Sequence, residues 1–266
     1  MADLSGIRIG IIGAGALGGA LIDRLLAAGR VRPDDIVACE PREARRQEIA
    51  GRFGVKVSAD PEDAAACTII VLAAPPLEIA KILKAIGPRL EHRPLVISCA
   101  GAIPLELLEA ALPAGVPVMR VNPNSPSLVG AGYNPMVHSA RMTGPARELA
   151  SRFLALLGDS PQVSDSEMNL YTALTAVGPT YFLPVFDAMI QAGTDGGLSR
   201  EAAVAAAVAT ARGSTEMIAR RREGAEPLKL YTGLRPLDHA AMRDLVAKAI
   251  ADALARMEAV QRQARS

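Results

Sequence analysis

Residues 7–19 read IRIGIIGAGALGG, and this stretch decides how the first half of the 266-residue chain folds. The apolar run at 7–12 predicts a short buried strand, and the pattern G-x-G-x-x-G follows it directly. An apolar helical pattern comes next, from Leu17 to Leu26. In such a strand–turn–helix, the glycines allow a tight turn, a close approach of a pyrophosphate to the backbone, and close packing of the helix.

The glycine pattern predicts a dinucleotide-binding site, and a tight turn without a ligand is the alternative. A lone pattern of this kind is weak evidence, but here a strand precedes it and a helix follows it. The free N–H groups at the start of the helix then face an anion. We expect the cofactor to contact Gly13, Gly15, Ala16, Leu17 and Gly18.

The composition narrows the possible functions. Half of the residues are hydrophobic but only 3% are aromatic, so aliphatic side chains must build the core. A net charge of +1 gives no electrostatic reason to expect nucleic acid or an anionic membrane as a partner. The three scattered cysteines predict reduced thiols in a cytoplasmic protein, and no metal site. Because there is no signal-peptide pattern and no unbroken apolar run of about 18 residues, we expect no membrane span.

Strand and helix patterns alternate through the rest of the first half. Strands are expected at 36–39, 55–57, 68–73, 95–98 and 116–121, and helices at 43–53, 77–90, 104–112 and 144–157. A last edge strand is expected at 162–164. The nearly continuous apolar character of 68–73 is typical of a parallel strand covered on both faces. The pattern predicts an α/β, Rossmann-type doubly wound parallel sheet, and we assign residues 1–163 to this dinucleotide-binding domain.

The end of the second expected strand carries conflicting signals about the cofactor. Glu40 follows the glycine loop by about twenty residues, where a carboxylate holds the adenosine ribose of NAD. Arg42, Arg45 and Arg46 follow, and guanidinium groups there bind the 2′-phosphate of NADP. Arg45 and Arg46 are equally consistent with a solvated helix face. Glu40 and Arg42 are therefore candidate cofactor residues, and the choice between NAD and NADP stays open.

Small residues end the two strands that follow. Ala73, Ala74 and Pro75 come after one of them, and Cys99 and Ala100 come after the other. We interpret these five residues as cofactor contacts along the carboxyl edge of the sheet. Plain tight turns, which need no ligand, are the alternative.

The strand expected at 116–121 leads into Asn-Pro-Asn at 122–124. Proline stiffens this segment, and the two amides offer hydrogen-bond donors and acceptors at the mouth of the sheet. We interpret Asn122 and Asn124 as substrate contacts. An Asx turn without a ligand is the alternative.

From residue 167 onward the strand signals stop, and we assign residues 164–266 to an all-α domain. A long helix is expected over 167–192 with an interruption around 178–179, followed by helices over 201–222 and 237–262. These helices carry apolar residues on more than one face, which predicts burial against a second copy of the chain. We therefore expect a homodimer through this domain.

Together with the glycine loop, four segments resemble the pyrroline-5-carboxylate reductase family. Residues 71–76 (VLAAPP) are similar to its L-A-V-K-P, and residues 97–102 (ISCAGA) to its S-x-A-A-G. Residues 119–126 (MRVNPNSP) resemble R-x-M-P-N-T-P, and residues 172–181 (TALTAVGPTY) resemble T-A-L-S-G-S-G-P-A-Y. The resemblance implies a Rossmann domain, a helical dimerisation domain and hydride transfer from NADP or NAD to a small cyclic imine, with NADP slightly favoured.

The chain also departs from the family's pattern. The family's S-P-G-G-T-T segment closes over substrate and nicotinamide, but residues 230–236 read LYTGLRP here. Pro75 stands in place of the family's lysine, and Asn122 in place of its methionine. The cofactor half is better preserved than the substrate half, so the reaction type is better supported than the substrate.

The expected site residues follow from this resemblance. Imine reduction requires mainly that the hydride donor and the imine carbon be held in line. We expect a substrate-binding set and a catalytic set. The first contains Asn122, Asn124, Gly178, Pro179, Thr232 and Arg235, and the second contains Thr175, Thr180 and Tyr231. A packing kink explains residues 178–179 without a ligand, and an exposed turn explains residues 231–235.

Three functions are compatible with these observations. The preferred one is an NAD(P)H-dependent imine reductase that acts on pyrroline-5-carboxylate or a related cyclic imine acid. The second is a non-catalytic, reductase-like protein that binds the dinucleotide and acts in regulation, which only the altered segment at 230–236 supports. A β-hydroxyacid dehydrogenase ranks last, because residues 167–192 contain no lysine to act in catalysis.

Overall fold

The computed structural model describes residues 3–221 and 237–265, which divide into two compact units. The first unit contains residues 1–177 together with 252–266, and the second contains residues 178–251. Each unit is described separately below. The domain boundary expected after residue 163 stays a prediction.

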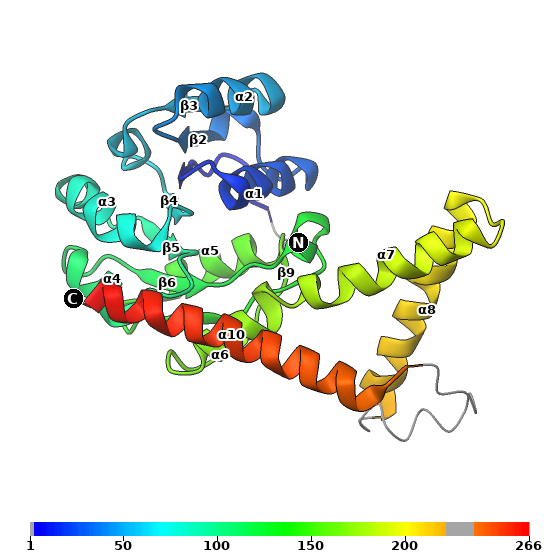
Figure 1. Cartoon of the computed structure of the whole chain (residues 1–266). Coiled ribbons are helices and arrows are strands. Elements are labelled where there is room, and N and C mark those ends of the chain that lie inside the picture. The colour runs from blue at the N-terminus through cyan, green and yellow to red at the C-terminus, as the bar shows by residue number, and fades with distance from the viewer. Residues whose placement is uncertain (1–2, 222–236, 266) are drawn as a thin grey trace. The chain divides into compact units, whose positions relative to one another are not determined.

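A seven-stranded sheet forms the centre of the first unit (Figure 1). Its order is β3-β2-β1-β4-β5-β6-β8, and every neighbouring pair is parallel except β6 with β8. This is a Rossmann-type order with one antiparallel strand added, so the predicted fold class is confirmed. The strands are β1 (Ile9–Ile12), β2 (Ile36–Cys39), β3 (Lys56–Ser58), β4 (Ile69–Leu72), β5 (Leu95–Ser98), β6 (Val118–Val121) and β8 (Met136–His138).

Helices cover both faces of the sheet, and the sheet separates the hydrophobic core into two clusters, one on each face. Successive residues of β4 point to opposite faces, so that Val71 belongs to one hydrophobic cluster and Leu72 to the other. Helices α1 (Ala16–Ala27), α2 (Glu43–Phe53) and α5 (Gly144–Leu154) supply side chains to the first cluster. Helices α3 (Ile79–Ile86) and α4 (Leu105–Ala111) supply side chains to the second. Burial on both faces explains the continuous apolar runs of the strands.

The short strands at the edge were missed by the sequence analysis. β8 has three residues, and β7 (Gly132–Tyr133) pairs with β9 (Gly158–Asp159) in a separate two-stranded sheet. Segments of two or three residues are too short to show a period of two, and β3 of the same length was expected because Gly54 marks the end of the helix before it. The expectation of an edge strand at 162–164 is wrong, because the described residues there form a single isolated β-bridge, between Gln162 and Met136, and no strand.

A π-helical turn interrupts the helical segment that follows. Helix α6 (Met168–Tyr171) runs into the π-helical turn Thr172–Ala176, which the sequence analysis did not anticipate. Helix α7 (Pro179–Asp195) begins with its N-cap at Gly178, which confirms the interruption expected there. The second unit continues with α8 (Arg200–Arg221), and α10 (His239–Arg265) begins in that unit and ends in the first.

By length and composition alone, the stretch Met168–Asp195 is apolar enough to cross a membrane. An 18-residue window within it has a mean hydropathy of 1.3, and 11% of that window is buried. The expectation of no membrane span rested on an unbroken apolar run, whereas this stretch reaches its mean with polar residues interspersed. Its exposed side chains include Phe182, Leu183 and Met189, so the same surface is a candidate for subunit contact.

Gly10 in β1 provides a test of the packing between the sheet and the short helix Pro61–Ala64. A methyl group added at Gly10 would lie 2.6 Å from Ala64 Cβ and 3.0 Å from the Ala64 carbonyl oxygen. We therefore expect Gly10→Ala to lower the free energy of unfolding by about 1–3 kcal/mol. The matched control is Gly51→Ala in α2, where an added methyl group meets nothing within 4 Å and should stabilise by about 0.5–1 kcal/mol. Urea unfolding measures both, and equal midpoints would contradict the packing argument.

Candidate active site

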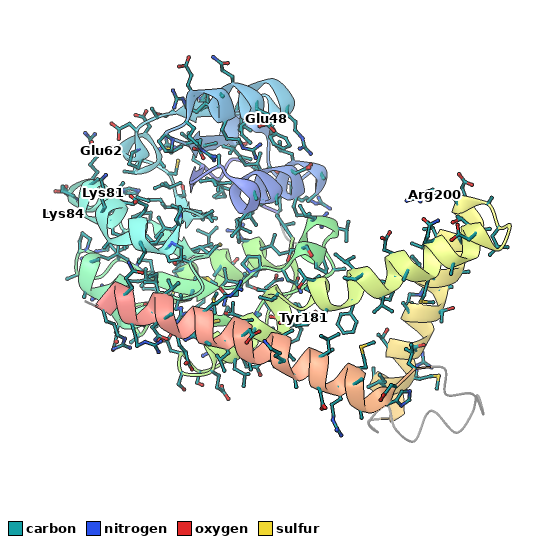
Figure 2. The ribbon with its side chains drawn as sticks, viewed as in Figure 1. Glu48, Glu62, Lys81, Lys84, Tyr181 and Arg200 are labelled. Carbon is teal, nitrogen blue, oxygen red and sulfur yellow. The ribbon has the colours of Figure 1, made fainter. Side chains whose placement is uncertain are left out.

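A cavity of about 740 Å³ lies along the carboxyl edge of the sheet in the first unit. Residues that follow β1, β2, β4 and β5 line it, which is where a doubly wound sheet binds its ligand. Lys81 and Ile82 of α3 also line the cavity, and the sequence pattern gave no signal for either. Figure 2 labels Lys81 on this helix. All the expected cofactor residues except Gly18 are in the lining: Gly13, Gly15, Ala16, Leu17, Glu40, Arg42, Ala73, Ala74, Pro75, Cys99 and Ala100.

The glycine loop fits a dinucleotide pyrophosphate. Gly13 has φ +95°, and a methyl group there would lie 2.6 Å from the Ala74 nitrogen. A methyl group on Gly18 would lie 1.9 Å from the Gly13 carbonyl oxygen, so α1 packs tightly onto the turn. Beside Gly15 the nearest atom is 3.8 Å away, which leaves its backbone approachable. Because no side chain of the described residues caps the start of α1, its N–H groups are available to an anion.

Two of the arginines after β2 hold the loops of the cavity in shape. Arg45 donates from Nε to the Ala14 carbonyl oxygen at 2.8 Å and from Nη2 to that of Gly15 at 3.0 Å. Arg46 donates from Nη1 to the carbonyl oxygen of Glu40 at 2.8 Å and to that of the next residue at 2.7 Å. Both side chains are half-buried, so the solvated-face alternative is wrong for both.

Glu40 and Arg42 form an ion pair at the end of β2. Arg42 Nε lies 2.7 Å from Glu40 Oε1, and the Arg42 backbone N–H donates to the same oxygen at 3.2 Å. The hydrogen bond from the Arg42 side chain holds the pKa of the Glu40 carboxyl below its usual value, against the opposite effect of burial. The Glu40 side chain is 5% exposed and that of Arg42 is 67% exposed. At this end of the cavity, the buried carboxylate of Glu40 therefore lies beside the exposed guanidinium of Arg42.

The cysteines of the cavity are protonated thiols. Burial raises the pKa of Cys39 and of Cys99 to about 12, and it also raises the pKa of Cys67. All three cysteines are free and buried, as expected for reduced thiols. A thiol of this kind is a poor nucleophile at neutral pH, so Cys99 contributes shape rather than covalent chemistry to the cavity.

The two asparagines after β6 bind the π-helical turn. Asn122 Nδ2 donates to Thr172 Oγ1, and Asn124 Nδ2 donates to the Thr175 carbonyl oxygen at 3.2 Å. The Thr175 hydroxyl in turn donates to the Tyr171 carbonyl oxygen at 2.8 Å. The structure therefore brings Asn122, Asn124 and Thr175 together, and π-helical turns are frequent at functional sites.

Arg120 in β6 is a buried charge that the sequence analysis missed. It is 2% exposed, pairs with Asp165 and donates to the Gly101 carbonyl oxygen. Burial lowers the pKa of the guanidinium, and Asp165 acts in the opposite direction. The sequence signal that could have revealed this buried charge is a single charged residue inside an otherwise apolar strand. By holding Gly101, Arg120 fixes the loop at one end of the cavity, since Gly101 is in the lining.

The remaining expected site residues lie elsewhere. Gly178, Pro179 and Thr180 belong to the second unit, at the start of α7. Tyr231, Thr232 and Arg235 fall outside the described residues. The structure thus places the expected cofactor residues together, and of the expected substrate and catalytic residues it brings together Asn122, Asn124 and Thr175.

Comparisons with known proteins give the family. Residues 165–260 match a family model described as pyrroline-5-carboxylate reductase dimerisation, and residues 8–101 match one described as NADP oxidoreductase coenzyme F420-dependent. A pyrroline-5-carboxylate reductase of Corynebacterium melassecola is 32% identical over 230 residues, which cover 85% of this chain and 84% of the relative. Another, of Pseudomonas aeruginosa, is 34% identical over 212 residues, which cover 79% and 77%. The chain belongs to the pyrroline-5-carboxylate reductase family.

Membership of the pyrroline-5-carboxylate reductase family confirms the resemblance seen in the sequence motifs. A crystal structure of Plasmodium falciparum pyrroline carboxylate reductase with NADP bound has a TM-score of 0.82 to this chain, with 23% identity, covering 96% of this chain and 98% of that one. At that identity the likeness shows the fold. Both the nucleotide-binding sheet and the helical dimerisation region of the family are therefore present in this chain.

Proposed function

We propose that this chain reduces the C=N bond of 1-pyrroline-5-carboxylate to give proline, or acts on a related small cyclic imine acid, with NAD(P)H as reductant. The observation that carries the substrate class is 32% identity, over 85% of the chain, with a relative of that activity. The cavity along the sheet edge supports the cofactor, because its glycine loop and its free helix N-terminus suit a pyrophosphate.

The reaction adds one hydride to the imine carbon and one proton to the imine nitrogen. When bound, the nicotinamide cofactor supplies the hydride, and water supplies the proton. The task of the chain is positioning. The start of α1 holds the pyrophosphate, Glu40 and Arg42 bind the adenosine end, and the loop after β5 receives the other end.

We assign the substrate to a wall formed by the β6 loop and the π-helical turn. The hydrogen bond from Asn124 to the Thr175 carbonyl oxygen supports this, since it joins a family motif of each segment. We assign substrate binding and catalysis to the residues expected from the sequence. Those for binding are Asn122, Asn124, Gly178, Pro179, Thr232 and Arg235, and those for catalysis are Thr175, Thr180 and Tyr231.

We propose NADP as the preferred cofactor. A structural relative holds NADP, and one matching family model carries NADP in its description. In this chain, the exposed guanidinium of Arg42 suits the 2′-phosphate, whereas the adjacent Glu40 carboxylate suits the ribose hydroxyls of NAD.

We further propose a homodimer through the helical region, in a reducing cytoplasmic setting. The match of residues 165–260 to a dimerisation model supports the dimer. The free, buried cysteines support the reducing compartment. Large apolar side chains are exposed on α7 and α8, namely Phe182, Leu183, Val185, Met189, Val204, Val208, Met217 and Ile218.

Turnover tests the proposed reaction directly. Purified protein should oxidise NADPH when 1-pyrroline-5-carboxylate is added, with proline as the product identified by mass spectrometry. Gly18→Ala is the control, because its methyl group clashes with the Gly13 carbonyl oxygen and should abolish cofactor binding. If the protein turned over another cyclic imine acid and not 1-pyrroline-5-carboxylate, that other acid would be assigned as the substrate. NADPH binding without turnover of any imine would favour the non-catalytic, regulatory alternative.

Two substitutions test the cofactor assignment. Arg42→Ala should weaken NADPH binding by about tenfold and leave NADH binding nearly unchanged, because the charge contact with the 2′-phosphate is lost. Glu40→Gln should shift the preference further toward NADPH, since an anion beside the phosphate is removed. Fluorescence titration of each reduced cofactor measures both, and an unchanged preference in both variants would refute the assignment.

The dimer is tested by its mass in solution. Each chain has a mass of 27.8 kDa, and light scattering should give twice that value. Val208→Asp should shift the protein toward monomer, because Val208 is 58% exposed within the chain and a buried charge disfavours the interface. A monomeric wild type, or a Val208→Asp variant with unchanged mass, would contradict this interface, and circular dichroism checks that the helices remain.

A further inference from the structure

The Asn122 side chain lies between the cofactor cavity and the π-helical turn. It is 4% exposed, and its Nδ2 donates to Thr172 Oγ1. On its other side is Gly101, which lines the cavity. A methyl group added at Gly101 would lie 2.8 Å from Asn122 Oδ1 and 3.2 Å from Nδ2. The absence of a side chain at position 101 therefore leaves room for this amide beside the cavity.

The hydrogen bonds of Thr172 fix which way the Asn122 amide is turned. The Thr172 hydroxyl has one proton, and it donates that proton to the Met168 carbonyl oxygen at 2.7 Å. Thr172 Oγ1 can then only accept from Asn122, so Asn122 must present its NH₂ group to it. As a consequence, the amide oxygen Oδ1 is directed away from Thr172. It is the atom nearest to the position that a Cβ of residue 101 would take.

Asn122 Oδ1 is an acceptor that lacks a donor among the described residues and is not itself fully buried. Within the described part of the chain, no hydrogen bond to this oxygen is found, although the residue is more than nine-tenths buried. The backbone of Gly101 is held on its far side, because its carbonyl oxygen accepts from Arg120. Because this oxygen has no donor of its own in the described chain and is not fully buried, a ligand that brings an N–H group to it gains a hydrogen bond.

The sheet order identifies which end of the cofactor reaches Gly101. The pyrophosphate site is at β1, and Glu40 takes the adenosine side at β2. β4 and β5 lie on the opposite side of β1, so the nicotinamide end runs toward the loop after β5, which contains Gly101. The nicotinamide ring carries a carboxamide with two N–H donors.

We propose that Asn122 Oδ1 accepts a hydrogen bond from the carboxamide N–H of the bound nicotinamide, and that Thr172 is the positioning residue that orients it. The inference rests on the proposed binding of NAD(P)H. It concerns a residue that departs from the family motif quoted above, which has methionine at this position. The hydrogen bond would fix the rotation of the nicotinamide ring, and therefore which face of the ring is turned toward the substrate.

A cofactor analogue that differs in one group tests the proposal by binding alone. The reduced 3-acetylpyridine analogue of NADPH has an acetyl group in place of the carboxamide and so lacks the N–H donor. Wild-type protein should bind NADPH about fivefold to tenfold more tightly than this analogue, the range expected for one hydrogen bond. Asn122→Met should reduce that ratio to about one, because methionine offers no comparable acceptor. Fluorescence titration measures both dissociation constants.

Further variants separate orientation from general damage. Thr172→Val should lower the ratio and Thr172→Ser should retain it, because serine keeps the acceptor for Asn122 Nδ2. Gly101→Ala should lower the ratio as well, since its methyl group displaces Oδ1. Asn169→Ala is the matched control, because the Asn169 amide donates to Gln261 Oε1, away from the assigned site, and the ratio should not change.

The possible outcomes distinguish this proposal from the proposed function. If wild type and Asn122→Met both bind NADPH and show the same ratio, the role of Asn122 is refuted while cofactor binding stands. A ratio of one in the wild type refutes it in the same way. If the wild type binds neither compound, the proposed function fails, and the role of Asn122 fails with it.

Discussion

The turn between β1 and α1 has no room for a side chain at Gly13 or Gly18, and the cofactor cavity depends on this constraint. The contact between Gly18 and the Gly13 carbonyl oxygen lets α1 start immediately above the end of β1, with its free N–H groups along the cavity. Arg45 then ties the loop to α2 through two carbonyl oxygens. Backbone geometry therefore builds the anion site, and a charged side chain from the neighbouring helix supports its shape.

Two buried charges, one in the lining of the cavity and one behind it, have partners. Glu40 is buried but bonded by Arg42, and Arg120 is buried but paired with Asp165 and bonded to Gly101. A buried charge without such a partner would destabilise the fold by several kcal/mol. The first pair lies within the loop after β2, and Arg120 joins β6 to the loop that contains Gly101. The electrostatic cost of burying charge is thus offset where the loops must be rigid to position a cofactor.

Much of the nucleotide-binding half could be predicted from the sequence, for an identifiable reason. The strands at 36–39 and 95–98 coincide with β2 and β5, because burial on both faces requires apolar runs that the sequence displays directly. The residues after those strands follow from topology, since parallel strands bring their carboxyl ends to one edge. β8 was not predicted because its three residues show no period and have no boundary signal like Gly54, which ends the helix just before the equally short β3. The π-helical turn was not predicted either, because a change from α-helical to π-helical hydrogen bonding changes the backbone partners without changing the apolar pattern.

The contacts within the candidate site were not predictable in the same way. The partners of Asn122 and Arg120 are residues distant in the sequence, and residues 230–236 fall outside the described structure.

Both edges of the sheet are short. β3 and β8 have three residues each, and Lys56 of β3 is exposed at its edge. Such an edge presents few unpaired N–H and C=O groups, and a lysine there opposes the approach of another strand. Copies of the chain therefore have little opportunity to join their sheets end to end, which is a common route to aggregation. The nucleotide-binding sheet is thus protected against edge-to-edge pairing with a second sheet.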